Sequence, residues 1–200
     1  RFETEYFIER QEFYLNKCFD EKIKLLDLGT GSGCIAIAIK KRNSQNIVFA
    51  SDISEKALQT AINNAYNNAC EISFIKSDVF KSINEKFDVI VSNPPYIAND
   101  EQIMNKVLLY EPKIALFANN NGLEFYEKIL KNAGNYLHKK NLIAFEIGAK
   151  QGEAIKEIAL KWFPKAEVII EEDLQKRKRF IFIMNNCWFF LILHKKSVIL

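Results

Sequence analysis

Short apolar runs alternate with helical patterns along almost the whole chain. This alternation is typical of a parallel sheet covered by helices. The predicted strands are residues 23–28, 47–51, 72–76, 87–92, 141–147, 166–171 and 179–184. The predicted helices are residues 34–43, 54–68, 122–138 and 150–162. Because only a short turn separates the last two strands, we expect an α/β fold with a doubly wound, seven-stranded sheet, mostly parallel, that ends in an antiparallel strand.

One domain accounts for most of the sequence. A chain of 200 residues, 48% of them apolar, can form a full-sized core, and neither a repeat nor a low-complexity linker divides it. We predict one domain over residues 1–184, followed by an atypical apolar tail over residues 185–200. The first residue is Arg rather than Met, which indicates a fragment of a longer protein.

Charge and cysteine content argue against several classes of protein. A net charge of +3, from 28 basic and 25 acidic side chains, is too small to indicate a stable nucleic-acid partner. No apolar run approaches the roughly 20 residues that a membrane-spanning helix needs. The four cysteines and two histidines lack metal-ligand spacing, so we predict free thiols and no metal site. We expect a cytoplasmic monomer.

A glycine-rich turn joins the first predicted strand to the first predicted helix. Gly29, Gly31 and Gly33 alternate there with Thr30 and Ser32. Such glycines let the backbone turn sharply and approach a ligand closely, with helix N–H groups facing it. No Gly-Lys-Ser/Thr follows, which excludes a P-loop, whereas a dinucleotide or another nucleoside cofactor fits the spacing. A turn without a ligand is the alternative.

Acidic residues follow the second and third predicted strands. Asp52 ends the second strand, where a carboxylate can accept both hydroxyls of a ribose. NAD and S-adenosylmethionine both contain that ribose, so Asp52 fits either. Asp78 follows the third strand, where it can accept from an adenine amine while Val79 packs on the ring. A solvated aspartate at a strand end is the alternative for Asp78.

The tetrapeptide Asn93-Pro94-Pro95-Tyr96 follows the fourth predicted strand. Two prolines fix φ twice and remove two N–H donors, which leaves a stiff turn with bare carbonyls. The side-chain oxygen of Asn93 and the carbonyl of Pro94 can then both accept from one planar NH2 group, and Tyr96 offers it a flat face. This arrangement suits a turn that presents an amide or aromatic amine to an electrophile. A plain Pro-Pro turn is the alternative.

Together these motifs resemble the class I S-adenosylmethionine-dependent methyltransferases, and more narrowly the protein-(glutamine-N5) methyltransferases that modify peptide chain release factors. The resemblance covers about residues 1–184. Beyond the two turns, it rests on Arg1–Glu5, Tyr110–Pro112 with Ala115 and Leu116, Asn121–Tyr126, and Phe145–Gly148 with Gln151 and Gly152.

The resemblance implies S-adenosylmethionine as the cofactor. Gly29–Gly33 would hold its methionine moiety, Asp52 its ribose and Val79 its adenine. Asn93–Tyr96 would hold the glutamine of a release factor's Gly-Gly-Gln loop, with Asn93 also beside the cofactor. Asn93 and Pro94 would accept both N–H bonds of the amide and strengthen them as positive charge develops on the nitrogen.

Three alternatives stay open at this point. A sister family methylates a ribosomal-protein glutamine, adenine-N6 methyltransferases of nucleic acid share the Asn-Pro-Pro-Tyr turn, and a cofactor-binding module would not catalyse at all. The chain also departs from the family pattern. Lys176 stands where the family has a glycine, and the family's upstream helical domain, which recognises the protein substrate, is absent from this sequence. The basic run Lys176–Arg179 is either a macromolecular contact or a solvated turn.

Overall fold

The computed structural model of the chain describes residues 2–95, 97–98, 117–118 and 122–187. Its strands are β1 (Lys24–Leu28), β2 (Ile47–Asp52), β3 (Ser73–Lys76), β4 (Phe87–Ser92), β5 (Ile97–Ala98), β6 (Phe117–Ala118), β7 (Leu137–Glu146), β8 (Glu167–Glu172) and β9 (Lys178–Asn185). Its helices are α1 (Phe2–Cys18), α2 (Cys34–Arg42), α3 (Glu55–Asn67), α6 (Glu124–Ala133) and α7 (Gly152–Trp162), with a 3-10 turn, η2 (Gly134–Tyr136), before β7.

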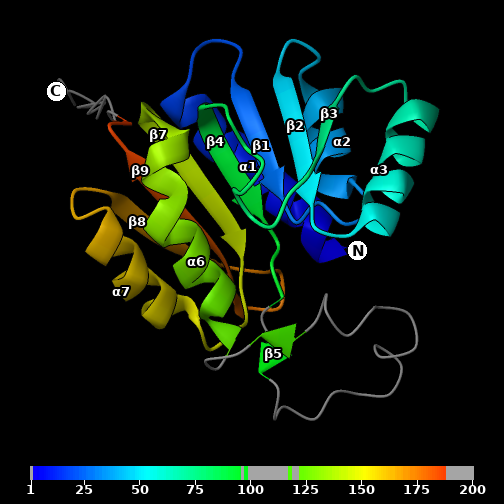
Figure 1. The fold of residues 1–200 in the computed structure, drawn as a ribbon. Coiled ribbons are helices and arrows are strands. Elements are labelled where there is room, and N and C mark those ends of the chain that lie inside the picture. The colour runs from blue at the N-terminus through cyan, green and yellow to red at the C-terminus, as the bar shows by residue number, and fades with distance from the viewer. Residues whose placement is uncertain (1, 96, 99–116, 119–121, 188–200) are drawn as a thin grey trace, which may run out of the picture.

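The main sheet has seven strands in the order β3-β2-β1-β4-β7-β9-β8 (Figure 1). The pairs from β3 through β7 are parallel, and β9 is antiparallel to both β7 and β8. The expected α/β fold, with a doubly wound sheet and an antiparallel last strand, is therefore confirmed. The strand order reverses between β1 and β4, which is where ligands bind in open sheets of this kind.

Helices cover both faces of the sheet (Figure 1). One core contains residues of α1 and α2 packed on Leu25, Val89 and Phe182, and the other packs α6 and α7 on Leu26, Ile90 and Ile143. Neighbouring residues of a strand thus belong to opposite cores. Since both cores are apolar, both residues are apolar too. A parallel strand buried on both faces reads as a continuous apolar run, which is why the sequence reveals these strands so clearly.

Helix α1 is absent from the sequence-based prediction, although its apolar residues have helical spacing. Phe7, Tyr14 and Cys18 are buried on one side of it. Phe7 stacks on Phe180 of β9 at 5.1 Å between ring centroids. The charged residues interspersed along this segment hide the pattern, and the tertiary contact with β9 decides the conformation.

An ion pair fixes α1 to the far edge of the sheet. Arg10 donates to both carboxylate oxygens of Glu171 on β8, at 2.6 and 2.7 Å, and the Tyr14 hydroxyl donates to the same carboxylate at 2.6 Å. Burial disfavours the charge on Glu171, but these hydrogen bonds outweigh it and hold the pKa of that carboxyl below its usual value.

The boundary between α6 and β7 differs from the prediction. A helix was expected over 122–138 and a strand over 141–147, whereas α6 ends at Ala133 and β7 begins at Leu137. Gly134 keeps right-handed helical dihedrals, φ −57 and ψ −27, and begins the 3-10 turn η2, so the α-helix tightens there before the chain enters β7. Leu137 is buried and pairs with Phe87 of β4, so pairing with the sheet outweighs local helical preference.

The expectation of four free thiols is wrong for two of them. Cys18 at the end of α1 and Cys187 after β9 form a disulfide, whereas Cys34 and Cys70 are free. The two bonded residues are 169 positions apart, and spacing in the sequence carries no information on such a pairing.

Asp173 organises the loop between β8 and β9. Its Oδ1 accepts from the backbone N–H groups of Gln175 at 2.8 Å and Arg177 at 3.0 Å, and its Oδ2 accepts from Arg177 Nε at 2.8 Å. Lys176 adopts φ 64, the left-handed conformation that a glycine takes most easily. The lysine that departs from the family pattern thus occupies a glycine-like backbone position.

We expect Lys176→Gly to raise the free energy of unfolding by about 0.5 kcal/mol. Relief of left-handed strain contributes about 1 kcal/mol, and the larger freedom of glycine in the unfolded chain offsets part of it. Urea titration measures the difference. Lys178→Gly, at a strand position, is the matched control and should destabilise the protein. If both substitutions lowered the free energy of unfolding by the same amount, the assignment of strain to Lys176 would be contradicted.

Candidate functional site

Four strands end side by side at the carboxyl edge of the sheet. Ser51 of β2 pairs with Leu28 of β1, Leu28 with Ser92 of β4, and Ser92 with Phe145 of β7. The residues that follow are Asp52, Gly29, Asn93 and Glu146, which we call the edge row. Neighbouring members lie roughly 5 Å apart because that is the spacing of paired strands. The topology therefore places the glycine turn directly beside the Asn-Pro-Pro-Tyr turn.

The Ser92 hydroxyl fixes this arrangement. It donates to the Leu28 carbonyl at 2.6 Å, across the point where both chains leave the sheet. Gly29 and Gly31 then take φ values of 70° and 57°, and a Cβ built on either would meet no atom within 4 Å. The turn is thus open above these two glycines, as a ligand cradle requires. Gly33 differs, because a Cβ there would lie 3.0 Å from the Cβ of Ala61, so it also allows α2 and α3 to pack closely.

Four backbone N–H groups of this turn are used within the chain. Gly29 and Thr30 donate to the Ser51 carbonyl at 2.8 and 2.9 Å, and Gly33 donates to the Thr30 carbonyl at 2.9 Å. Gly31 donates to Asp52 Oδ2 at 2.9 Å. These four donors are therefore not directed at an anion. A pyrophosphate would have to bind to the other N–H groups at the start of α2.

Asp27 lies beneath the turn and is absent from the residues predicted from the sequence. Its Oδ2 accepts from Thr30 Oγ1 at 2.6 Å and from the Ala36 N–H at 3.2 Å. The side chain is fully buried, and no donor from the described residues reaches its Oδ1. Burial, reinforced by the charge of Asp52 and opposed by the two hydrogen bonds, raises the pKa of Asp27 to about 6. A buried acceptor without a donor fits a positively charged ligand group.

The structure brings Asp52 to the same turn. Its Oδ1 accepts from the Ser54 N–H at 2.8 Å, while its Oδ2 holds Gly31. A carboxylate has about four acceptor positions, so hydroxyl groups can still bind to it. Ser54 also caps α3, since its Oγ accepts from the Ala57 N–H at 3.3 Å. The role of Asp52 toward a ribose stays a prediction, and its geometry allows it.

Asp78 and Val79 follow β3, next to α6. Lys128 and Lys81 lie 2.7 and 2.6 Å from the two carboxylate oxygens of Asp78, and their hydrogen bonds hold its pKa below its usual value. Acceptance from an adenine amine stays a prediction for Asp78, which already pairs with both lysines. Val79 has φ 52, an outlier for a β-branched residue. Backbone strain of this kind is concentrated at functional sites.

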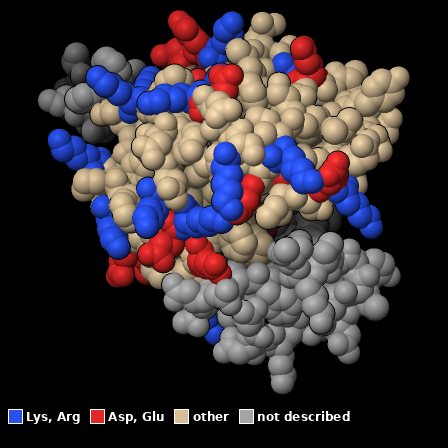
Figure 2. Space-filling view, in the orientation of Figure 1, with Lys and Arg blue, Asp and Glu red and all other residues tan. Residues whose placement is uncertain are grey.

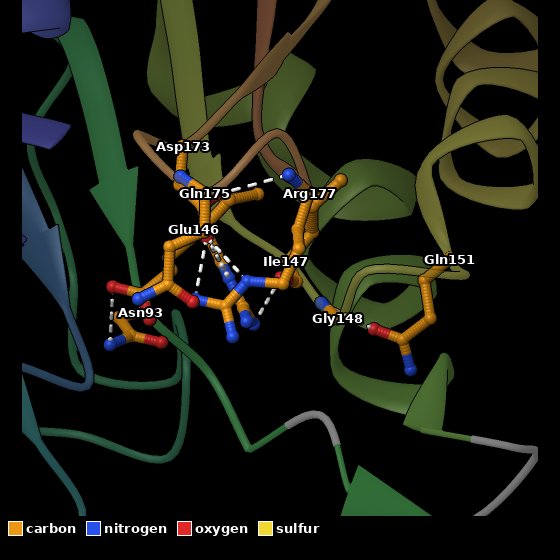
Figure 3. Close-up of polar contacts among 9 residues, drawn as sticks. Asn93, Glu146, Ile147, Gly148, Gln151, Asp173, Gln175 and Arg177 are labelled. Atoms are coloured by element: carbon orange, nitrogen blue, oxygen red, sulfur yellow. Dashed lines mark hydrogen bonds and ion pairs between the residues drawn. The ribbon is translucent and has the colours of Figure 1, made fainter. Parts of the chain in front are cut away.

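Asn93 leaves β4 and contacts the neighbouring strand β7. Its Nδ2 donates to Glu146 Oε2 at 2.9 Å (Figure 3). Pro94 is buried and Pro95 half-buried, which agrees with a stiff turn. Tyr96 lies outside the described residues, as do Arg1, residues 110–116 and Asn121. Like Asp27, Glu146 is absent from the site residues predicted from the sequence, although it lies within the motif Phe145–Gly148.

The basic run Lys176–Arg179 makes contacts within the chain. Arg177 is paired with Asp173 at 2.7 Å, Lys178 with Glu153 at 2.6 Å, and Arg179 Nη1 donates to the Ile147 carbonyl at 3.2 Å. Figure 2 shows basic and acidic side chains interspersed on the visible face. These contacts favour a role within the fold over a macromolecular contact, and the expected solvated turn is only partly observed because Lys178 and Arg179 belong to β9.

Two further findings concern the described part of the chain alone. Within it, no three His, Cys, Asp or Glu side chains lie close enough together to hold a metal ion. Nor is any helix there long and apolar enough to cross a membrane.

Comparison with known proteins identifies close sequence relatives. Residues 12–115 match the methyltransferase small domain family. The release factor glutamine methyltransferase of Lactococcus lactis subsp. lactis (strain IL1403) is 45% identical over 175 residues, 86% of this chain and 65% of that protein. The release factor glutamine methyltransferase of Streptococcus pneumoniae (strain ATCC BAA-255 / R6) is 40% identical over 177 residues, 88% and 63% of the two chains. This chain therefore spans less than two thirds of either relative. The resemblance predicted from the motifs is confirmed.

Solved structures agree on the fold. The protein-(glutamine-N5) methyltransferase (release factor-specific) from Alicyclobacillus acidocaldarius superposes with a TM-score of 0.58 at 23% identity, covering 92% of this chain and 93% of that one. A methyltransferase from Pyrococcus furiosus gives a TM-score of 0.64 at 20% identity, covering 88% and 82%. At these identities the likeness concerns the arrangement of strands and helices, and it matches the sheet described above.

Proposed function

Because this chain belongs to the methyltransferase small domain family and is similar to release factor glutamine methyltransferases along most of its length, we propose that it methylates glutamine in a protein of translation. The substrate is the Gly-Gly-Gln loop of a peptide chain release factor, and the methyl group goes to the side-chain amide nitrogen. The cofactor is S-adenosylmethionine, and the reaction takes place in the cytoplasm, where release factors act.

The edge row is the observation that carries this proposal. It puts a carboxylate suited to a ribose, an open glycine turn and an amide-bearing Pro-Pro turn on three adjacent strands. A methyl donor held by the first two would therefore lie next to an acceptor held by the third. Methyl transfer needs little more than this, because its main requirement is a nucleophile held close to the methyl group and in line with it.

The residues around the glycine turn fit S-adenosylmethionine better than a dinucleotide. Asp27 offers a buried carboxylate oxygen to the ammonium group of the methionine moiety, and the space above Gly29 and Gly31 admits its chain. Asp52 accepts from the ribose hydroxyls, and Val79 borders the adenine. When bound, S-adenosylmethionine would supply a methyl group on a positively charged sulfur, and the completed transfer would leave an N-methyl amide, the neutral thioether S-adenosylhomocysteine and one proton for solvent.

The Asn-Pro-Pro-Tyr turn orients the substrate amide. Asn93 Oδ1 and the Pro94 carbonyl accept its two N–H bonds, while a contact with Tyr96, which lies outside the described residues, rests on the sequence motif alone. An amide nitrogen is a poor nucleophile because its lone pair is delocalised into the carbonyl. The two acceptors bind more strongly as positive charge develops on the nitrogen, so they stabilise the transition state more than the substrate.

Transfer of label tests the proposal directly. The chain is incubated with methyl-labelled S-adenosylmethionine and a release factor that carries a Gly-Gly-Gln loop. We expect label in this protein and none in a Gly-Gly-Ala version or in an adenine-containing oligonucleotide. Label in the oligonucleotide would favour an adenine-N6 methyltransferase instead. Cofactor binding by calorimetry without transfer to any acceptor would favour a binding module.

A further inference from the structure

We propose that Glu146 is a positioning residue for methyl transfer: its carboxylate sets the orientation of the Asn93 amide, so that Oδ1 rather than Nδ2 faces the substrate. This inference rests on the proposed function and names a residue to which that function assigns no role. The two residues lie on adjacent strands, Asn93 immediately after β4 and Glu146 at the end of β7 (Figure 3).

The hydrogen bond between these residues fixes the amide in one orientation. Asn93 turns its NH2 group toward Glu146, which suits a carboxylate because a carboxylate has acceptors and no donors. Nδ2 lies 2.9 Å from Oε2. Oδ1 then lies on the opposite side of the amide, and no hydrogen bond from the described residues occupies it. Without a charged acceptor at this place, the amide could rotate by 180° and present a donor, which repels the N–H groups of a substrate amide.

The structure holds Glu146 firmly enough for this task. Its side chain is only 4% exposed, and its backbone carbonyl accepts from the buried Tyr126 hydroxyl at 2.9 Å. The next residue, Ile147, donates its N–H to the Arg179 carbonyl at 2.8 Å and accepts from Arg179 Nη1 at 3.2 Å. Contacts from α6 and β9 therefore hold the backbone from which this carboxylate extends at the end of β7.

The charge on Glu146 also makes Asn93 a better acceptor. A hydrogen bond from an amide N–H to a carboxylate pushes electron density toward the amide oxygen, since bonds in a chain polarise one another. The substrate N–H groups then bind to a more negative oxygen. Both proposed effects of Glu146 on the substrate pass through the hydrogen bond to Asn93, and this makes the inference testable by pairs of substitutions.

The first test is Glu146→Gln, which keeps the shape of the side chain. Glutamine offers a donor as well as an acceptor, so Asn93 can pair with it in either orientation. We expect kcat for transfer to the Gly-Gly-Gln release factor to fall about 10- to 100-fold. The dissociation constant of S-adenosylmethionine and the melting temperature should barely change. Glu171→Gln is the matched control: it weakens the contact between α1 and β8 and should lower stability without lowering kcat.

A double-mutant cycle separates positioning from an independent effect. If Glu146 acts through Asn93, Asn93→Ala with Glu146→Gln should be no slower than Asn93→Ala alone. If the fall in kcat of the double variant equalled the product of the two single falls, the inference would be overturned. An unchanged kcat in Glu146→Gln would overturn it as well. If the wild-type chain labels no acceptor, the proposed function fails first, and the inference fails with it.

An exchange of the two groups provides a second variant pair. Asn93→Asp alone puts two carboxylates face to face and should reduce both stability and transfer. Adding Glu146→Gln restores an amide and a carboxylate in one hydrogen bond, with an acceptor oxygen again facing the substrate. We expect this second substitution to raise kcat at least 10-fold over Asn93→Asp. A further loss would mean that Glu146 serves the fold and not the orientation of residue 93.

Discussion

Asn93→Ala is expected to reduce kcat for methylation of the release factor by about 100-fold or more. The side chain supplies one of two acceptors that strengthen as charge develops on the substrate nitrogen, and a charge-assisted hydrogen bond contributes roughly 1.5–3 kcal/mol. Loss of a comparable oriented group in other active sites costs about 100- to 1,000-fold in kcat. Initial rates with labelled cofactor measure the fall, and calorimetry should show an almost unchanged affinity for S-adenosylmethionine.

Asn141→Ala is the matched control for this substitution. Asn141 is a buried asparagine within β7 of the same sheet, whereas Asn93 is half-buried, and Asn141 bonds to the His138 carbonyl at 2.7 Å and to Asn185 at 2.9 Å. Its loss should lower the melting temperature and leave kcat per folded molecule unchanged. If Asn93→Ala lowers cofactor affinity and kcat by the same factor, then Asn93 has a structural role and the proposal that it accepts from the substrate amide is wrong.

The positions of most candidate residues follow from the sequence because they follow strands. Gly29 and Asn93 come directly after apolar runs, and parallel strands deliver such residues to one edge of the sheet. The prolines and glycines that follow the strands have characteristic backbone conformations, so the turns at strand ends can be predicted from the sequence. Fold class and the location of the site were therefore predictable without any contact information.

Residues inside or at the ends of strands were harder to assign. Asp27 and Glu146 are acidic residues among apolar ones, and they form hydrogen bonds with Ala36 and Asn93, nine and 53 positions away. Only the folded arrangement shows that one lies beneath the glycine turn and the other against the Asn93 amide. A charged residue within a run that reads as fully buried was the available signal, because burying an unpartnered charge is costly.

Asp27→Asn is expected to stabilise the fold at pH 7 by about 1–3 kcal/mol. The folded-state pKa of Asp27, about 6, lies above its ordinary value of 3.8, so the folded protein holds this proton more tightly than the unfolded chain does. Ionisation therefore lowers stability as the pH rises from about 4 to about 6, and the full loss, about 1.4 kcal/mol for each pKa unit, persists above pH 6. Asparagine removes this loss, although its amide N–H groups need acceptors. Urea titrations at pH 4 and pH 7 measure the difference, which should be small at the lower pH.

The same substitution should weaken binding of S-adenosylmethionine by about 100-fold at pH 7. A buried carboxylate that accepts from an ammonium group contributes roughly 3 kcal/mol, and an amide replaces it poorly. Wild-type affinity should also fall below pH 6, where Asp27 takes up a proton, while the affinity of Asp27→Asn stays level in that range.

Asp88→Asn is the matched control, since Asp88 accepts from the Lys24 N–H at the start of β1, away from the edge row. Greater stability together with lost affinity would mean that the buried charge is retained for the ligand and at the expense of the fold. Unchanged affinity in Asp27→Asn would remove Asp27 from the proposed cofactor site.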